Sequence, residues 1–248
     1  MLELKNIYKT FNPGTINEKR ALNGLNLKLN EGDFVTVIGG NGAGKSTMLN
    51  AVAGTWPVDE GQILIDNIDV TKLSEHKRAT YLGRVFQDPM TGTAATMGIE
   101  ENLALAKRRG KSRLLRSGIT KAEREEYKEL LKILGLGLED RLTSKVGLLS
   151  GGQRQALTLL MATLQKPKLL LLDEHTAALD PKTAAKVLEI TDMIVNRDHL
   201  TTLMITHNMK DAIAHGNRLI MMMEGKIILD IQGEEKKKLT VKKLQNKG

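Results

Sequence analysis

The sequence contains no cysteine, only 3 % aromatic residues and no long uninterrupted apolar segment. Without cysteine it forms no disulfides, which fits a cytoplasmic address. A membrane-spanning helix needs roughly 18 consecutive apolar residues, and the longest candidate runs, residues 169–172 and 219–223, are far shorter. Residues 1–10 alternate charged and apolar side chains and lack the apolar segment of a secretory signal. We therefore expect a cytoplasmic protein that does not cross a membrane by itself.

The chain has a formal net charge of +8, and clustered Lys and Arg attract the phosphates of nucleic acids or of lipids. The basic residues concentrate in two runs, residues 107–116 and 236–247. No aromatic side chains interleave with these runs as base-stacking platforms would. We interpret both runs as solvated or facing anionic lipid, and we expect no nucleic-acid partner.

The hydrophobic pattern of the 248 residues predicts an α/β fold. Strands are predicted at residues 2–7, 25–29, 34–38, 61–65, 169–172 and 202–205, and helices at 46–53, 183–197 and 209–215. A hairpin is predicted over residues 218–229, with its turn at Glu224-Gly225-Lys226. Residues 88–145 have helical spacing, clearest at 121–134, and predict a helical lobe. Alternating strands and helices favour a mainly parallel sheet that binds ligands at the carboxyl ends of its strands.

A glycine-rich loop joins a predicted strand to a predicted helix and fits the pattern G-x-x-x-x-G-K-[ST]. In this context successive backbone N–H groups curl around phosphate oxygens, and the helix N-terminus adds a favourable dipole. Lys45 is expected to reach the outer phosphates and Ser46 to ligate Mg²⁺. The sequence thus predicts an ATP and Mg²⁺ site made by Gly39, Gly40, Asn41, Gly42, Ala43, Gly44, Lys45, Ser46 and Thr47.

The apolar run 169–172 ends in two adjacent carboxylates, Asp173 and Glu174. A buried strand exposes its last residues at the nucleotide crevice, so Asp173 is expected to hold the Mg²⁺ shell. Glu174 is expected to accept a proton from an attacking water. An apolar run that ends in acids is common by itself, but beside a phosphate loop it predicts the second half of an NTPase site.

A second glycine motif, Leu-Ser-Gly-Gly-Gln at residues 149–153, narrows the class. A serine and two glycines that open a helix make another phosphate-binding N-terminus. One chain needs only one γ-phosphate cradle, so the second is best explained by the nucleotide of a partner chain. In these three motifs and their order the sequence resembles the ABC ATPase family over essentially its whole length. The resemblance implies that Ser150, Gly151, Gly152 and Gln153 contact ATP.

The resemblance implies one P-loop NTPase domain over residues 1–248, with a mainly parallel core sheet, an antiparallel β subdomain and a helical subdomain. Residues 1–88 and 146–248 would form the core with the β subdomain, and residues 89–145 the helical subdomain. It also implies that Phe11 stacks on adenine, where Tyr is more usual, and that Asp180 belongs to a loop crossing the dimer interface. Gln87 would touch Mg²⁺ and the attacking water, and His207 would contact the γ-phosphate.

Three positions depart from the family pattern. The family commonly has Pro at the position of His175, Ser at that of Ala177, and Pro or Ser at that of Gly40. None of these changes removes a phosphate, metal or proton-transfer group. We hypothesise that His175, directly after Glu174, modulates the environment of that carboxylate through its titratable ring, which a His175→Pro variant with an altered pH dependence of turnover would support.

The resemblance implies a head-to-tail homodimer that encloses two ATP molecules, each between the Lys45 loop of one chain and residues 150–153 of the other. In-line attack by water would be oriented by Glu174, Gln87 and His207, while Lys45 and Mg²⁺ offset charge on the phosphoryl group. The implied role is to energise a membrane importer from the inner face of the cell membrane. Separate permease subunits would dock on the helical lobe, and a substrate-binding protein would belong to the same system. The motifs look most like ATPases of amino-acid systems grouped with tryptophan or tyrosine uptake.

Alternative roles remain open on the sequence. An exporter ATPase shares the same ATP chemistry, and gene neighbours would separate it from an importer. A soluble ABC protein that acts on ribosomes or nucleic acid belongs to a different class, and its translation-type members resemble two such domains joined in one chain. A catalytically idle regulator is disfavoured because the catalytic positions hold Lys45, Ser46, Asp173, Glu174 and His207.

Overall fold

The computed structural model describes residues 1–110 and 118–245. Its core is a six-stranded sheet of strand order β10-β9-β3-β8-β7-β6. These strands are β3 (Phe34–Ile38), β6 (Leu82–Val85), β7 (Leu169–Asp173), β8 (Thr201–Ile205), β9 (Arg218–Met223) and β10 (Lys226–Gln232). All neighbours are parallel except β9 and β10, which form an antiparallel hairpin. The predicted mainly parallel core sheet is confirmed.

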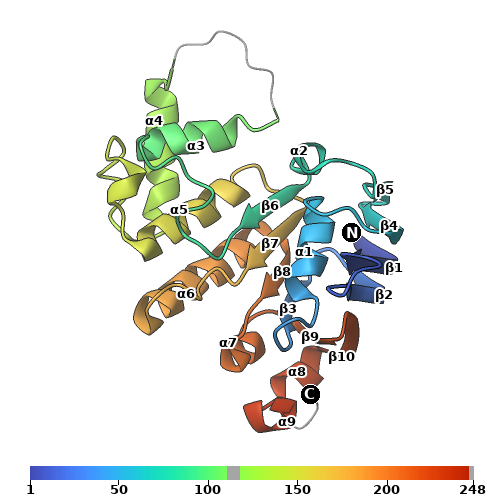
Figure 1. Cartoon of the computed structure of the whole chain (residues 1–248). Coiled ribbons are helices and arrows are strands. Elements are labelled where there is room, and N and C mark those ends of the chain that lie inside the picture. Colours follow the sequence, from blue (N-terminus) through green and yellow to red (C-terminus); the bar gives the residue numbers. More distant parts are fainter. Residues whose placement is uncertain (111–117, 246–248) are drawn as a thin grey trace.

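A second, four-stranded sheet of order β2-β1-β4-β5 is antiparallel throughout. It consists of β1 (Leu2–Phe11), β2 (Lys19–Leu29), β4 (Glu60–Ile65) and β5 (Ile68–Asp69). In Figure 1 this sheet lies on one side of the core, opposite the helical lobe. The first two strands are longer than predicted, because β1 and β2 also pair, through register shifts, at the end of β1 and the start of β2, where the apolar alternation is not clear.

The helices surround the core sheet and form a lobe at one end (Figure 1). The lobe contains α3 (Ile99–Lys107) and α4 (Lys121–Lys132), as the helical spacing predicted. Next to the core lie α1 (Lys45–Ala53), α2 (Glu75–Arg78), α5 (Gly151–Thr163), α6 (Pro181–Asp198) and α7 (Met209–Ala214). The short helices α8 (Gly233–Lys237) and α9 (Val241–Gln245) follow near the C-terminus, and a short 3₁₀ turn precedes α5 at Val146–Leu148. No helix within the described ranges is long and apolar enough to span a bilayer.

Strand β7 contributes side chains to both of the large apolar clusters of the core. Side chains alternate between the faces of a strand, and here Leu169 and Leu171 enter one apolar cluster with α1 and the antiparallel sheet. Leu170 and Leu172 enter a second cluster with α5, α6 and the helical lobe. A strand that is apolar on both faces is typical of a buried parallel sheet, and its polar end then emerges between the two clusters.

One prediction about charge is wrong at the start of the C-terminal basic run. Lys236 was expected to be solvated or to face lipid, yet it is only 3 % exposed. Its ammonium donates to the carbonyl oxygens of His215 and Gly216, directly after α7. Burial lowers the pKa of Lys236 to about 8. The end of a short helix therefore supplies the acceptors that compensate this buried cation.

Candidate nucleotide site

A cavity of about 220 Å³ lies at the carboxyl end of β3, against the glycine-rich loop. The loop requires glycine at its two ends. At Gly39, with φ of 150°, a Cβ would stand 2.3 Å from the Met222 carbonyl oxygen. At Gly44, with φ of 99°, a Cβ would stand 2.5 Å from the Ala21 carbonyl oxygen. The walls are Phe11, Lys19, Ala21, Asn41, Gly42, Ala43, Gly44, Lys45, Ser46, Thr47, Glu174 and His207. Most of the predicted loop residues and three distant predicted residues therefore meet in one place.

Lys45 is anchored within this loop. Its Nζ donates to the carbonyl oxygens of Gly39 at 2.8 Å and Gly40 at 3.1 Å. Burial lowers the pKa of Lys45, and the nearby carboxylates of Glu174 and Asp173 oppose that shift. A lysine held this way at a helix N-terminus is a donor ready for phosphate oxygens.

The adjacent strands β7 and β8 bring an acid and an imidazole together. Glu174 follows β7 in the left-handed region, with φ of 48°, and its backbone N–H donates to Ile205 at 3.1 Å. His207 follows β8, and its Nε2 lies 2.6 Å from Glu174 Oε1. A carboxylate held by a second polar side chain at the mouth of a cavity is suited to accept a proton from bound water.

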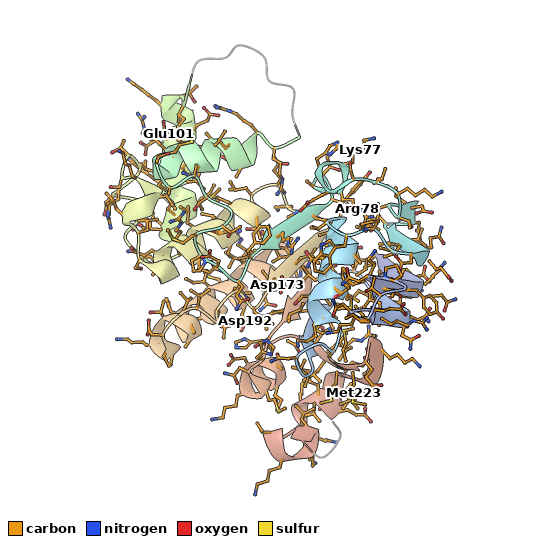
Figure 2. All side chains as sticks on the ribbon, in the orientation of Figure 1. Lys77, Arg78, Glu101, Asp173, Asp192 and Met223 are labelled. Carbon is orange, nitrogen blue, oxygen red and sulfur yellow. The ribbon has the colours of Figure 1, made fainter. Side chains whose placement is uncertain are left out.

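Asp173 ends β7 near the middle of the molecule (Figure 2). Burial raises the pKa of this carboxyl, while Arg84 acts in the opposite direction. Ser46 is an exposed residue on the otherwise buried first turn of α1, and it lines the cavity. Asp173 is not among the walls of the cavity. A carboxylate and a hydroxyl are oxygen ligands of the kind Mg²⁺ takes alongside substrate phosphates, so these two residue types fit the metal that the sequence predicted.

Phe11 occupies the rim of the cavity. Its ring packs edge-on against Trp56, with centroids 5.0 Å apart, and the Lys9 ammonium lies 5.6 Å from its centroid. Phe11 is partly exposed rather than a core residue. The ring is thus fixed beside the phosphate loop, where a base can stack on it.

Other predicted site residues lie outside the walls of this cavity. Gln87 is exposed, two residues after β6 ends. Ser150 caps α5 and forms a reciprocal capping box with Gln153. Asp180 caps α6 by accepting from the Thr183 backbone N–H at 3.1 Å. Within one chain Ser150, Gln153 and Asp180 cap helices, and neither they nor Gln87 line the cavity at the glycine-rich loop.

Packing gives a structural reason for Gly152, one of the two glycines of the motif at residues 149–153, which is called the signature motif below. A Cβ built on it would stand 2.1 Å from Thr183 Cγ2 on α6. The neighbouring Gly151 has its nearest atom, Leu179 Cδ2, at 3.2 Å. The close approach of α5 to α6 therefore favours glycine at 152 even apart from any ligand.

The hypothesis that the His175 ring titrates beside Glu174 is contradicted. His175 is 1 % exposed, and its Nε2 lies 3.0 Å from Thr191 Oγ1 on α6. Burial, and then repulsion from His215, lower the pKa of His175 to about 4. The ring is neutral near pH 7 because α6 covers it, and it packs against that helix.

Two cationic residues near the site were not identified from the sequence. Lys19 opens β2 and lines the cavity, and Arg84 lies on β6 with its guanidinium 3.6 Å from Asp173. The four-residue β6 carries an arginine and was not predicted as a strand, so no sequence signal placed Arg84 beside the site.

The first basic run lies partly outside the described residues, which omit 111–117. In the described part, Lys107 forms an ion pair with Glu126 of α4 and Arg108 one with Glu123. These charges are thus paired within the lobe. The predicted lipid contact of residues 111–116 lies outside the described part of the chain.

A parallel sheet with a glycine-rich phosphate loop after one strand and an acidic pair after another defines a P-loop NTPase. The family described as "ABC transporter" matches residues 22–177. The chain belongs to this family and is an ABC transporter ATP-binding domain, which implies ATP binding and hydrolysis.

Individual relatives agree with this assignment. The chain is 45 % identical to a tyrosine transport ATP-binding protein of Clostridioides difficile, over 100 % of the chain and 98 % of that protein. It is 34 % identical to a spermidine/putrescine import ATP-binding protein of Haemophilus influenzae over 93 % of the chain, and spans 57 % of that relative. A solved ATP-binding cassette, dimeric with ADP and phosphate, superposes with a TM-score of 0.78 at 32 % identity, covering 94 % of this chain and 98 % of that one.

Proposed function

We propose that this chain is the Mg²⁺-dependent ATPase subunit that energises a membrane importer of a small solute such as an amino acid. The observation that carries the ATPase part is the convergence of Lys45, Glu174 and His207 on one cavity. The amino-acid part is supported by the relative named as a tyrosine transport ATP-binding protein, with which the chain aligns over its whole length. The importer part is supported by the relative named as a spermidine/putrescine import ATP-binding protein.

In the proposed reaction, the loop from Gly39 to Thr47 binds the phosphates through its N–H groups and Lys45. Glu174 accepts a proton from a water in line with the γ-phosphate, and His207 orients that carboxylate from 2.6 Å. Ser46 and Asp173 would hold Mg²⁺, which supplies charge compensation on the phosphates. Phe11 would stack on the adenine. Gln87 lies outside the cavity walls, so its proposed role requires that its loop approach the nucleotide.

We further propose that the active site is completed by a second copy of the chain. Ser150, Gly151, Gly152 and Gln153 lie away from the cavity of their own chain, as expected if they bind the nucleotide of the partner. Asp180 would contribute at the same interface. ATP then holds two chains together head to tail, and hydrolysis weakens the closed dimer.

We also propose that the chain works with separate permease subunits and with a substrate-binding protein. It would lie on the inner face of the cell membrane. We assign residues 89–145 as the lobe that docks on the permease, and residues 1–88 and 146–248 as the nucleotide-binding core. Uptake of radiolabelled tyrosine and other amino acids by a deletion strain tests the importer role. We expect reduced uptake of one amino-acid class, and unchanged uptake of all of them would refute it.

The catalytic assignment is tested with a Glu174→Gln chain. The amide keeps the size of the side chain but cannot accept the proton, so hydrolysis should fall by about 10²–10⁴-fold while ATP still binds. Size-exclusion chromatography with ATP and Mg²⁺ should then show a persistent dimer. Unchanged hydrolysis with no dimer would refute both the Glu174 role and the shared site.

A further inference from the structure

Arg84 contacts Asp173, one of the two residues proposed to ligate Mg²⁺, and is linked through Asn50 to the helix that carries the other, Ser46. Its NH2 nitrogen is 3.6 Å from Asp173 Oδ2, and both side chains are largely buried, with 14 % and 17 % of their surface exposed. The same nitrogen donates to Asn50 Oδ1 at 2.7 Å. Asn50 Nδ2 in turn donates to the Ser46 carbonyl oxygen at 2.8 Å. A continuous polar chain therefore runs from the start of α1 to the end of β7.

The guanidinium is fixed on its other sides as well. Its NH1 donates to Thr55 Oγ1 at 3.1 Å and lies 3.9 Å from Oε1 of the exposed Glu75, and its CZ atom stands 4.6 Å from the centroid of the Phe86 ring. Arginine is suited to this place because one planar fork bonds to several acceptors and also stacks on an aromatic face. Arg84 is consequently a cation with little freedom to leave the carboxylate.

The two acidic residues have different basic partners. Glu174 contacts His207, whereas Asp173 faces Arg84. Lys45 influences both carboxylates electrostatically, but its ammonium bonds to the carbonyls of Gly39 and Gly40. Arg84 is therefore the cation that faces the carboxylate proposed to bind metal.

We infer that Arg84 is a positioning residue that acts as a built-in counter-cation of Asp173 and keeps divalent metal from binding there without nucleotide. A fixed positive charge next to a carboxylate repels an incoming divalent ion at short range. The phosphates of ATP bring enough negative charge to offset this repulsion, so metal enters together with nucleotide. The inference rests on the proposed role of Asp173 as a metal ligand.

The test measures Mn²⁺ binding without nucleotide, using electron paramagnetic resonance to follow free Mn²⁺. Arg84→Met removes the charge and replaces the arginine with an unbranched apolar side chain. It should bind Mn²⁺ at least about tenfold more tightly than the unmodified chain, because a nearby repulsion is lost. A gain that depends on Asp173 does not arise from carboxylates exposed by damage to the fold. Equal affinities in the two proteins would overturn the inference.

Three further variants locate the effect. Arg84→Lys keeps the charge and should stay within about threefold of the unmodified chain. Asn50→Ala frees the guanidinium and should give a smaller gain, and combining it with Arg84→Met should add nothing further. Asp173→Asn in the Arg84→Met chain should abolish the gain. If the gain persists without Asp173, the metal binds elsewhere and the inference is wrong.

The Mn²⁺ comparison is made without nucleotide, so its outcome can be told apart from failure of the proposed ATPase function. Failure of the unmodified chain to bind ATP, measured by calorimetry, would refute the proposed function and leave the Mn²⁺ comparison readable. ATP binding with no change of Mn²⁺ affinity in Arg84→Met would refute only the role of Arg84.

Discussion

His207 Nε2 lies 2.6 Å from Glu174 Oε1, and the two residues come from the ends of adjacent parallel strands. The pairing depends on the core sheet, because β7 and β8 deliver their last residues to the same edge. The Glu174 backbone N–H also donates to Ile205, the last residue of β8. The carboxylate is thus tied to β8 by its main chain and by its side chain.

Removal of the imidazole should therefore misplace the carboxylate. We expect His207→Ala to lower the turnover number for ATP by about 10²-fold, with a smaller change in ATP affinity, because orientation of the base is lost. Steady-state phosphate release and calorimetry separate the two quantities. His76→Ala, at an exposed position of α2, is the control. Wild-type turnover in His207→Ala would contradict the role.

Trp56 should report nucleotide binding. It is the single tryptophan of the chain, and its ring contacts Phe11 at the rim of the cavity. We expect ATP to change the tryptophan fluorescence, and Phe11→Ala to weaken ATP binding by about 1–3 kcal/mol if the base stacks on that ring. Phe11→Tyr should retain the affinity. An unaffected affinity in Phe11→Ala would place the adenine elsewhere.

The close contact between α5 and α6 predicts a rescue experiment. Gly152→Ala should destabilise the chain by roughly 1–3 kcal/mol, because the new Cβ overlaps Thr183 Cγ2 and a β-branched side chain has few alternative rotamers. Thr183→Ser removes that methyl group and should restore most of the loss. Urea denaturation of the single and double variants measures their free energies of unfolding. A Gly152→Ala chain as stable as the unmodified one would contradict the packing argument.

His175 should make the fold sensitive to acid. Its pKa falls from 6.5 to about 4 in the folded chain, so the unfolded chain takes up a proton first as the pH drops. The stability that the neutral ring contributes is present above pH 6.5 and is lost as the pH falls toward 4, by about 2–3 kcal/mol.

His175→Gln keeps a polar partner for Thr191 and cannot titrate. Denaturation midpoints at pH 7, 6 and 5 should fall less steeply in this variant than in the unmodified chain. Parallel pH dependences would show that the ring titrates as it does in the unfolded state.

Much of the site was predictable because its parts are local. The glycine-rich loop, Lys45 and Ser46 form one short segment whose pattern allows few other conformations. The run at β7 predicted a buried strand because it is apolar on both faces, and Asp173 and Glu174 then had to emerge at its carboxyl end.

The features that escaped prediction depend on contacts between distant segments. Arg84 contacts α1 and β7 from a strand too short to recognise in the sequence. The side chain of His175 packs against α6, sixteen residues away at Thr191, although Glu174 is adjacent to it in the chain. Lys236 is buried because the carbonyls after α7 accept its hydrogen bonds. No pattern in a single segment reports such contacts.

The shared active site is the central claim, and mixing two defective chains tests it most directly. In a Glu174→Gln background, one chain carries Lys45→Met and the other Ser150→Arg, with different affinity tags. A head-to-tail mixed dimer keeps one intact site, made from the unaltered loop of one chain and the unaltered signature motif of the other. We predict that ATP and Mg²⁺ bring down the second tag with the first in the mixture, while neither chain dimerises alone. Absence of the mixed complex, when each chain is folded and the parent Glu174→Gln chain dimerises, would contradict the two-chain site.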